Sequence, residues 1–312
     1  MTLLRTPDDC FANLSGYPFS PRYLRIPAEA VASGPKEVGA AALRMHYLDA
    51  GSGSPVLLLH GEPTWSYLYR DFIPPLVARG YRCIAPDHLG FGKSDKVVED
   101  GWYTYERHVL ALKELVHALD LQGVTLVVHD WGGPIGLRLL CEEAWRFRKV
   151  VVLNTWLHRA GYVYSDGIAR WRSFATSFEP GSGDIPCGAI VSRTLSQVDD
   201  ERRAAAVAAY DAPFPDASFK AGPRRFPQML PFADPAGGGA AQQAATFAAL
   251  AKLNIPVQFI FGDRDVVFPP SQAADWAAEL RDATVETVRG GHFPQEESAS
   301  LIVSYILRDV RG

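Results

Sequence analysis

The stretch that decides the fold reads Val124-Thr125-Leu126-Val127-Val128-His129-Asp130-Trp131-Gly132-Gly133-Pro134-Ile135-Gly136. Its first half is an aliphatic and β-branched run, which is typical of a strand buried on both faces. Glycines follow, Pro134 suits the first turn of a helix, and an apolar helical face continues the pattern. Strand, tight turn and helix make a nucleophile elbow, whose apex residue faces the ligand. The sequence places Asp130 at this apex.

An aspartate at the apex predicts its own chemistry. The Asp130 carboxyl is an anion at neutral pH, so it needs no base before it attacks. A carboxylate is a good nucleophile for displacement at saturated carbon, and the attack gives an alkyl-enzyme ester that water must hydrolyse. The alternative is that Asp130 only caps the helix that follows, as aspartate often does.

The composition limits the classes of function. The chain has 312 residues, of which 47% are hydrophobic, enough for one large α/β domain with an inserted subdomain. A formal net charge of -4 gives no basic field for nucleic acid or acidic membranes. No long apolar segment opens the chain, so we expect neither a signal peptide nor a membrane anchor. The cysteines show no ligand spacing for structural zinc, and they suit a reducing, cytoplasmic location; they are Cys10, Cys83, Cys141 and Cys187. We expect no metal and no cofactor.

Strand and helix patterns alternate along most of the chain. The alternating run at 43–49 predicts an edge strand, and helices are predicted from about Ser66, at 103–119 and at 240–251. This rhythm indicates an α/β fold with a mostly parallel, doubly wound sheet. The other predicted strands lie at 56–59, 81–85, 124–129, 149–153, 257–261 and 284–288.

The rhythm is interrupted in the middle of the chain. Residues 156–228 hold aromatic residues, short helical patterns and Pro/Gly breaks, but no convincing buried strand. We therefore expect a core made of residues 1–155 and 229–312, with a helical cap formed by residues 156–228.

Two further groups belong with Asp130. Gly262-Asp263-Arg264-Asp265 follows one predicted strand, and Gly290-Gly291-His292-Phe293 follows the last. Both lie at carboxyl ends of strands, where open α/β sheets bind ligands. The order nucleophile, acid, histidine is that of α/β hydrolases. His292 would activate water and a carboxylate would orient its imidazole; we favour Asp265, with Asp263 as the alternative.

Ester hydrolysis also needs donors for an oxyanion. The backbone N–H groups that usually supply them follow the nucleophile and the third strand, here those of Trp131 and Glu62. The alternative is that residues 60–63 form an ordinary tight turn with no catalytic role. A zinc site is not indicated, because the sequence has no H-E-x-x-H motif.

At this point a family resemblance becomes specific. The segment 60–70, His-Gly-Glu-Pro-Thr-Trp-Ser-Tyr-Leu-Tyr-Arg, and the segment 129–133, His-Asp-Trp-Gly-Gly, resemble the haloalkane dehalogenases. The likeness is greatest to the subfamily with Glu after the His-Gly pair. Segments 87–95 and 212–216 are also similar, so the resemblance covers nearly the whole chain.

The resemblance implies an α/β-hydrolase fold and hydrolysis of haloalkanes to alcohol and halide, with a small halogenated hydrocarbon, water and a halide ion as partners. It also implies that two indole N–H groups hold the departing halide, as an indole donates one hydrogen bond and cannot act as a base. These are Trp131 and a cap tryptophan, Trp171, with Trp156 as the alternative. We expect a monomer or weak dimer. Apolar residues expected in the pocket, each of which also suits a packing role, are Phe174, Phe178, Phe214, Pro215 and Phe293.

Two other functions compete with this reading. An epoxide hydrolase would use the same aspartate, histidine and acid, with cap tyrosines as donors to the epoxide oxygen. Tyr162, Tyr164 and Tyr210 are available for that role. A non-catalytic binding protein on the same fold is expected to have lost a member of the triad, whereas this sequence keeps every candidate.

Overall fold

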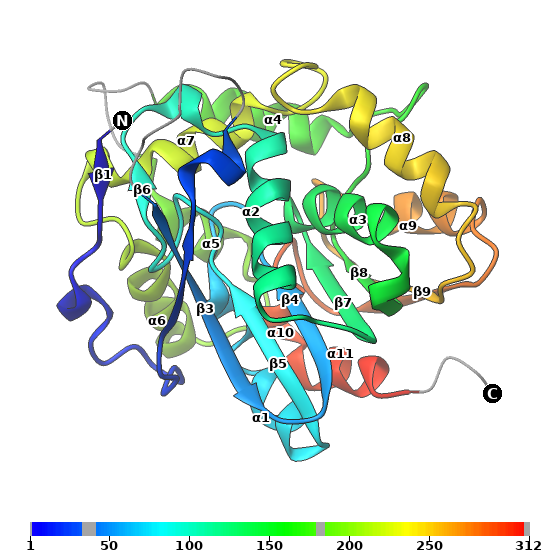
Figure 1. The fold of residues 1–312 in the computed structure, drawn as a ribbon, viewed down its shortest axis with the longest axis horizontal. Helices are drawn as coiled ribbons and strands as arrows, with labels where there is room; N and C mark the ends of the chain where they lie inside the picture. Colours follow the sequence, from blue (N-terminus) through cyan, green and yellow to red (C-terminus); the bar gives the residue numbers. More distant parts are fainter. Residues whose placement is uncertain (1, 33–41, 179–184, 309–312) are drawn as a thin grey trace.

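A computed structural model describes residues 2–32, 42–178 and 185–308. Its centre is an eight-stranded sheet in the order β10-β9-β8-β7-β4-β5-β3-β2 (Figure 1). The strands from β10 to β5 in this order are parallel, and β3 and β2 continue the sheet antiparallel. Their bounds are β2 Arg22–Ile26, β3 Leu43–Gly51, β4 Ser54–Leu59, β5 Tyr81–Pro86, β7 Val124–His129, β8 Phe147–Leu153, β9 Val257–Gly262 and β10 Ala283–Val288. A second sheet pairs β1 Leu3–Leu4 with β6 Lys96–Val97.

All seven strands predicted from the sequence are present, but one prediction about their order is wrong. The strand at 43–49 is β3, which lies between β2 and β5 and is not an edge strand. The edge is β2, where only Ile26 is fully buried. A strand with so few buried residues leaves a weak hydrophobic pattern, which is why the sequence did not reveal it.

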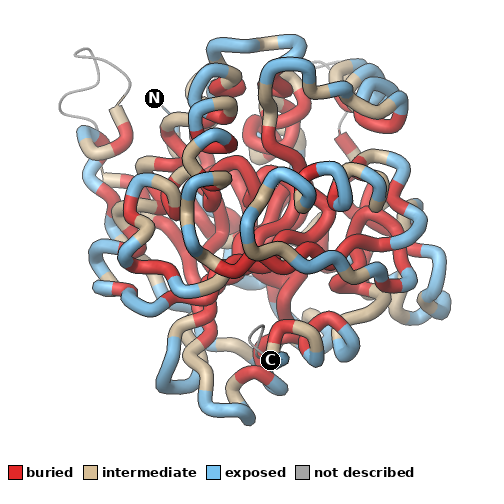
Figure 2. Tube along the Cα trace, turned by 90° about the vertical axis from the view of Figure 1, so that its right-hand side faces the viewer, coloured by how far each residue is buried: buried red, intermediate tan, exposed pale blue. Residues whose placement is uncertain are grey.

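Helices cover both faces of the sheet, because successive side chains of a strand point to opposite sides. Leu57 and Leu59 of β4 belong to one buried cluster, and Val56 and Leu58 belong to the other. Figure 2 shows the buried centre that results. Helices that pack into the first cluster are α2 Tyr105–Ala118, α3 Gly132–Glu142, α8 Ala240–Leu250 and α9 Pro270–Ala277; those on the second face are α1 Ile73–Ala78 and α11 Ala299–Ile306, which follows the short α10 Pro294–Glu297.

Capping side chains explain where several helices begin. Thr104 accepts a hydrogen bond from the N–H of Arg107 at the start of α2, as an N-cap residue does. The helix predicted from about Ser66 is a 3₁₀ turn, η4 Ser66–Tyr69, and α1 starts four residues later. The other 3₁₀ turns within residues 2–32, 42–178 and 185–308 are η1 Asp8–Phe11, η2 Ala28–Val31, η5 Asp100–Trp102, η6 Ala144–Arg146 and η7 Ala217–Lys220.

Among the described residues, the chain between β8 and α8 forms helices joined by turns and irregular segments, and no strand. It contains α4 Asp166–Ala175, α5 Cys187–Thr194, α6 Asp200–Asp211 and α7 Ala221–Gln228, and Figure 1 places α4 and α7 at the top of the view, away from α1. The Ser165 hydroxyl donates to the carbonyl of Val267 after β9, at 2.6 Å. The Ser196 N–H donates to Glu297 after β10, also at 2.6 Å. These contacts hold the helical segment over the carboxyl ends of the strands.

Among the described residues, no helix is long and apolar enough to cross a membrane.

Candidate active site

Asp130 occupies the turn between β7 and α3. Its φ of 48° is in the left-handed region, which non-glycine residues rarely adopt. The Asp130 N–H donates to the Asn154 carbonyl at 3.2 Å, and the Thr155 hydroxyl donates to the Asp130 carbonyl at 2.6 Å. A Cβ added at Gly61 would collide with the Asp130 carboxylate. No side chain caps the start of α3, so the helix-capping alternative does not fit this turn.

Backbone donors surround the Asp130 carboxylate. The Glu62 N–H donates to Oδ1 at 2.7 Å, and the nearby Trp131 N–H also favours the ionised carboxylate. Oδ2 lies 3.5 Å from Nε2 of His292. Burial alone would raise the pKa of Asp130, but the hydrogen bond and positive charge of His292 outweigh it and hold the pKa below its usual value. Asp130 is therefore an anion with two backbone N–H groups aimed at it.

His292 stands between two carboxylates. Its Nδ1 lies 2.9 Å from Oδ2 of Asp265, and because a carboxylate only accepts, Nδ1 carries the proton. Burial lowers the pKa of His292, but Asp265 and then Asp130 outweigh that effect and raise the pKa to about 10. Asp263 is exposed, and its carboxylate accepts from the Gly290 N–H at 3.1 Å. The structure thus brings Asp265, and not Asp263, against His292.

Asn154 is a residue of this site that sequence reasoning missed. Its Nδ2 donates to Oδ2 of Asp265 at 2.8 Å, and its Oδ1 accepts from the Gly262 N–H at 2.9 Å. The Val267 N–H donates to the other oxygen of Asp265 at 2.7 Å. The available signal was its place directly after β8, the neighbour of β7, since the residues after parallel strands meet at one edge of the sheet.

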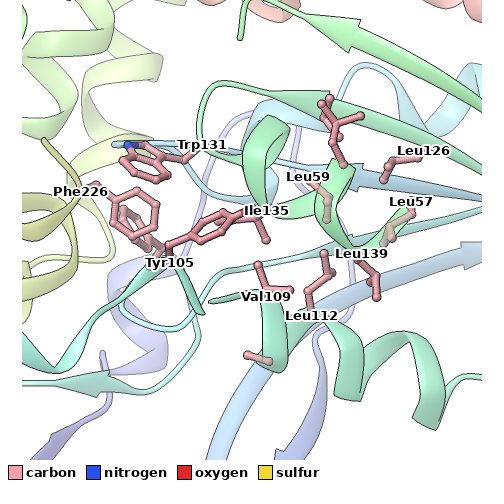
Figure 3. Packing of buried hydrophobic residues seen from close by; sticks show 14 of the residues in the cluster. Leu57, Leu59, Tyr105, Val109, Leu112, Leu126, Trp131, Ile135, Leu139 and Phe226 are labelled. Atoms are coloured by element: carbon pink, nitrogen blue, oxygen red, sulfur yellow. The ribbon is translucent and has the colours of Figure 1, made fainter. Parts of the chain in front are cut away.

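A small cavity of about 50 Å³ lies beside Asp130. Trp131, Trp156 and Trp171 all line it, and the rings of Trp131 and Trp156 meet edge to face at 4.9 Å. Figure 3 shows the Trp131 ring packed beside Phe226, at one end of the buried cluster. The lining residues are Glu62, Pro63, Asp130, Trp131, Trp156, Ile168, Trp171, Ile190, Thr194, Leu230, Val267, Phe268, His292 and Phe293.

Only Phe293 of the five predicted apolar pocket residues lies in this lining. Phe174 is 38% exposed and packs against Phe178, with ring centroids 5.1 Å apart. Phe214 is buried near the Lys96 ammonium group, and Pro215 is exposed. These four apolar residues therefore pack the helical segment or face solvent.

The cavity lining also includes residues that the sequence did not single out. Val267 and Phe268 come two and three residues after Asp265, so their position in the chain was the available signal. Ile168 and Ile190 gave no signal, because a helical apolar pattern does not separate a cavity wall from packing inside the cap. Leu230, in the irregular segment after α7, gave no signal either.

Glu62 places a second carboxyl group beside the nucleophile. The residue is 4% exposed, and its Oε1 has no hydrogen-bond partner in the part of the chain that the structure describes. Burial and then the charge of Asp130 raise the pKa of Glu62 well above its usual value. Both effects disfavour a second negative charge on Glu62 beside the Asp130 carboxylate.

The three cap tyrosines are bonded away from the cavity. The Tyr162 hydroxyl donates to Gln272 at 3.0 Å, that of Tyr164 lies 2.9 Å from His158, and that of Tyr210 donates to Glu296 at 2.6 Å. None of the three lies in the lining found among the described residues. The same residues contain no cluster of side chains suited to a metal ion.

Known proteins resemble this chain along nearly its whole length. The family model described as alpha/beta hydrolase fold matches residues 54–299. A haloalkane dehalogenase of Psychrobacter cryohalolentis is 39% identical and one of Mycolicibacterium paratuberculosis is 43% identical, each match covering 98% of both chains. A solved haloalkane dehalogenase from Paraglaciecola agarilytica NO2, described as tetrameric, is 31% identical with a TM-score of 0.85, and the match covers 98% of this chain and 97% of that one.

Proposed function

Because the chain belongs to the haloalkane dehalogenases, within the alpha/beta hydrolase fold family, we propose that Asp130 is the nucleophile of a two-step hydrolysis of carbon–halide bonds. The observation that carries this proposal is the position of one anionic carboxylate between a buried histidine and an apolar cavity. The substrate is a halogenated hydrocarbon, and the products are an alcohol and a halide ion.

In the first step, an oxygen of the Asp130 carboxylate attacks the carbon that bears the halogen. A carbon–oxygen bond forms while the carbon–halogen bond breaks, and the halide leaves with the electron pair. The apolar lining excludes water from the carboxylate, which makes the anion a stronger nucleophile. Burial and the charge of Asp130 disfavour ionisation of Glu62, which limits the repulsion of the departing halide by a second negative charge.

The halide needs hydrogen-bond donors that do not compete for the carbon. Trp131 and Trp171 line the cavity and offer indole N–H groups, so we assign halide binding to this pair. Trp156 lines the same cavity and is the alternative second donor. Comparing halide binding in a Trp171 variant and a Trp156 variant separates the two assignments.

In the second step, His292 activates water. Alkylation removes the charge of Asp130, so the pKa of His292 falls from its resting value and the imidazole becomes a base. Nε2 takes a proton from water, and the hydroxide adds to the ester carbonyl. The Glu62 and Trp131 N–H groups hold the oxyanion. The carbon–oxygen bond to the alkyl group breaks, and the alcohol leaves with the proton that His292 took from water. The remaining carboxyl proton passes to His292 as the carboxylate reforms.

We further propose the organisation of the chain. Residues 156–228 act as a cap over a core made of 1–155 and 229–312, and the contacts of Ser165 and Ser196 with the loops after β9 and β10 support this division. Four free cysteines support a reducing, cytoplasmic location. A monomer or weak dimer stays a prediction, which light scattering after gel filtration tests.

The experiment that tests the function compares two classes of substrate. The purified protein is expected to release bromide from 1,2-dibromoethane and 1-bromobutane and to form no diol from styrene oxide. An epoxide hydrolase would give the reverse result, although the bonded positions of Tyr162, Tyr164 and Tyr210 do not favour it.

A further inference from the structure

A buried histidine contacts the carbonyl end of the peptide group whose N–H donates to Asp130. His60 follows β4 and is fully buried. Its Nδ1 lies 2.8 Å from the carbonyl oxygen of Gly61. That carbonyl belongs to the same planar peptide group as the Glu62 N–H, which donates to Oδ1 of Asp130 at 2.7 Å. One peptide group therefore joins the imidazole of His60 to the nucleophile.

The partners of His60 fix which of its nitrogens carries the proton. The backbone N–H of His88 points at Nε2 of His60 at 2.9 Å, and a backbone N–H can only donate. Nε2 is thus the unprotonated nitrogen, and Nδ1 carries the hydrogen that the Gly61 carbonyl accepts. Burial lowers the pKa of His60 despite the nearby charges of Asp87 and Asp130, so the ring stays neutral.

The Gly61 carbonyl accepts more hydrogen bonds than the single one that closes an ordinary turn. Besides His60, it accepts from the N–H and from the hydroxyl of Thr64, each at 3.0 Å. Donors on a carbonyl polarise its peptide group and strengthen the hydrogen bond that the N–H at the other end makes. They also fix the plane of the peptide, and so the direction of the Glu62 N–H.

We propose that His60 is a positioning residue that strengthens the Glu62 N–H as an oxyanion donor and thereby favours hydrolysis of the alkyl-enzyme over its formation. This inference rests on the function proposed above. During alkylation, negative charge leaves the Asp130 carboxylate, so a donor on Oδ1 gives the transition state no advantage. During hydrolysis, charge grows on the carbonyl oxygen of the ester, and the same donor stabilises that transition state.

Three substitutions test this role. His60→Leu removes the donor, whereas His60→Asn keeps an N–H near the position of Nδ1. Both variants lose the acceptor for the His88 N–H. A difference between their kinetics therefore reports the loss of the hydrogen-bond donor to the Gly61 carbonyl. His108→Leu is the control for repacking, because the ring centroids of His108 and His88 are 5.6 Å apart. Neither nitrogen of His108 has a hydrogen-bond partner among the described residues, so this variant removes no hydrogen bond seen there.

The kinetic readout is the fraction of enzyme that carries the alkyl group during steady turnover of 1,2-dibromoethane, measured by intact mass after an acid quench. In His60→Leu we expect hydrolysis to slow about tenfold, less than the 10²–10³ for loss of a whole oxyanion donor, because Thr64 still holds the carbonyl. The first-turnover bromide burst keeps its rate, so the alkylated fraction rises. His60→Asn and His108→Leu stay near wild type. An unchanged fraction in His60→Leu, or equal impairment of His60→Asn, overturns the proposal.

A second readout needs no turnover. The amide proton of Glu62 should resonate at low field in the wild type, move to higher field in His60→Leu and Asp130→Asn, and return in His60→Asn. A resonance that does not move in His60→Leu contradicts the role of His60. A wild type that neither releases bromide nor gains an alkyl group contradicts the proposed function instead, while the amide resonance still decides the role of His60.

Discussion

Asn154 and His292 share one oxygen of Asp265. The amide of Asn154 donates to Oδ2 at 2.8 Å, and the same oxygen lies 2.9 Å from Nδ1 of His292. The other oxygen accepts from the Val267 N–H, and the Asp265 side chain is fully buried. Asp265 is thus held in one orientation, so it can set both the position and the charge of the imidazole.

Asp265→Asn is expected to lower kcat by about 10²- to 10⁴-fold, because the amide no longer stabilises the imidazolium that forms in the second step. It should also lower the pKa of His292, which Asp265 raises. Steady-state kinetics and a histidine titration by nuclear magnetic resonance measure both effects. Asp263→Asn, at the exposed neighbouring carboxylate, is the matched control and should keep wild-type kcat. Equal losses in the two variants would exclude Asp265 as the specific partner.

Bromide is expected to quench tryptophan fluorescence, and Trp171→Phe should weaken bromide binding by about 10- to 100-fold. That range corresponds to the roughly 1.5–3 kcal/mol of a hydrogen bond to a charged group. Trp145→Phe is the control, as Trp145 is 66% exposed and absent from the cavity lining. If Trp156→Phe weakens binding and Trp171→Phe does not, the second donor is Trp156.

The two steps are expected to respond differently to pH. Asp130 stays ionised until the pH falls below 3.8, since its pKa is lowered, so alkylation continues in mildly acidic buffer. Water activation needs neutral His292, and hydrolysis therefore slows as the pH falls through the pKa of His292 in the alkyl-enzyme. That pKa lies below the resting value of about 10, because the charge of Asp130 has gone. Intact mass after an acid quench should show more alkyl-enzyme at lower pH, and a fraction that falls instead would contradict this order of steps.

A buried ion pair in the core, between Arg70 after η4 and Glu296 of α10, also contacts α6, and its loss should destabilise the fold. Glu296 accepts from the Arg70 guanidinium at 2.6 and 2.7 Å, and Arg202 of α6 also reaches it at 3.0 Å. Glu296→Gln leaves buried positive charge unpaired, which costs about 3–5 kcal/mol in the free energy of unfolding. Glu142→Gln, in more exposed pairs with Arg138 and Lys113, should cost less than about 1 kcal/mol. Urea unfolding compares the two variants, and similar costs would count against the importance of the Glu296 contact.

The elements predicted best from the sequence were those with strong local signals. Strand β7 is buried along its full length, and the break into glycines marks the turn at Asp130, so fold class and apex residue followed from one stretch. Buried strands β4, β8 and β9 were equally clear. Strand β2 was missed because Ile26 alone of its residues is buried, which leaves a weak hydrophobic pattern.

The parts of the site that could not be predicted depend on tertiary contacts. The sequence favoured Asp265 but left Asp263 open as the alternative, and the fold brings Asp265 against His292. Four of the five expected pocket residues lie outside the cavity lining, because apolar side chains in a helical cap serve its own packing equally well. The link from His60 to Asp130 runs through a backbone peptide, which a sequence does not display.

The most direct test of the central mechanism uses His292→Gln, which removes the base and leaves the nucleophile in place. Incubation with 1,2-dibromoethane should release one equivalent of bromide and leave one bromoethyl group on the protein, and peptide mass spectrometry should locate it at Asp130. Asp130→Asn in the same background should gain none. A folded His292→Gln protein that carries no adduct, or carries it on another residue, would contradict attack by Asp130 on carbon.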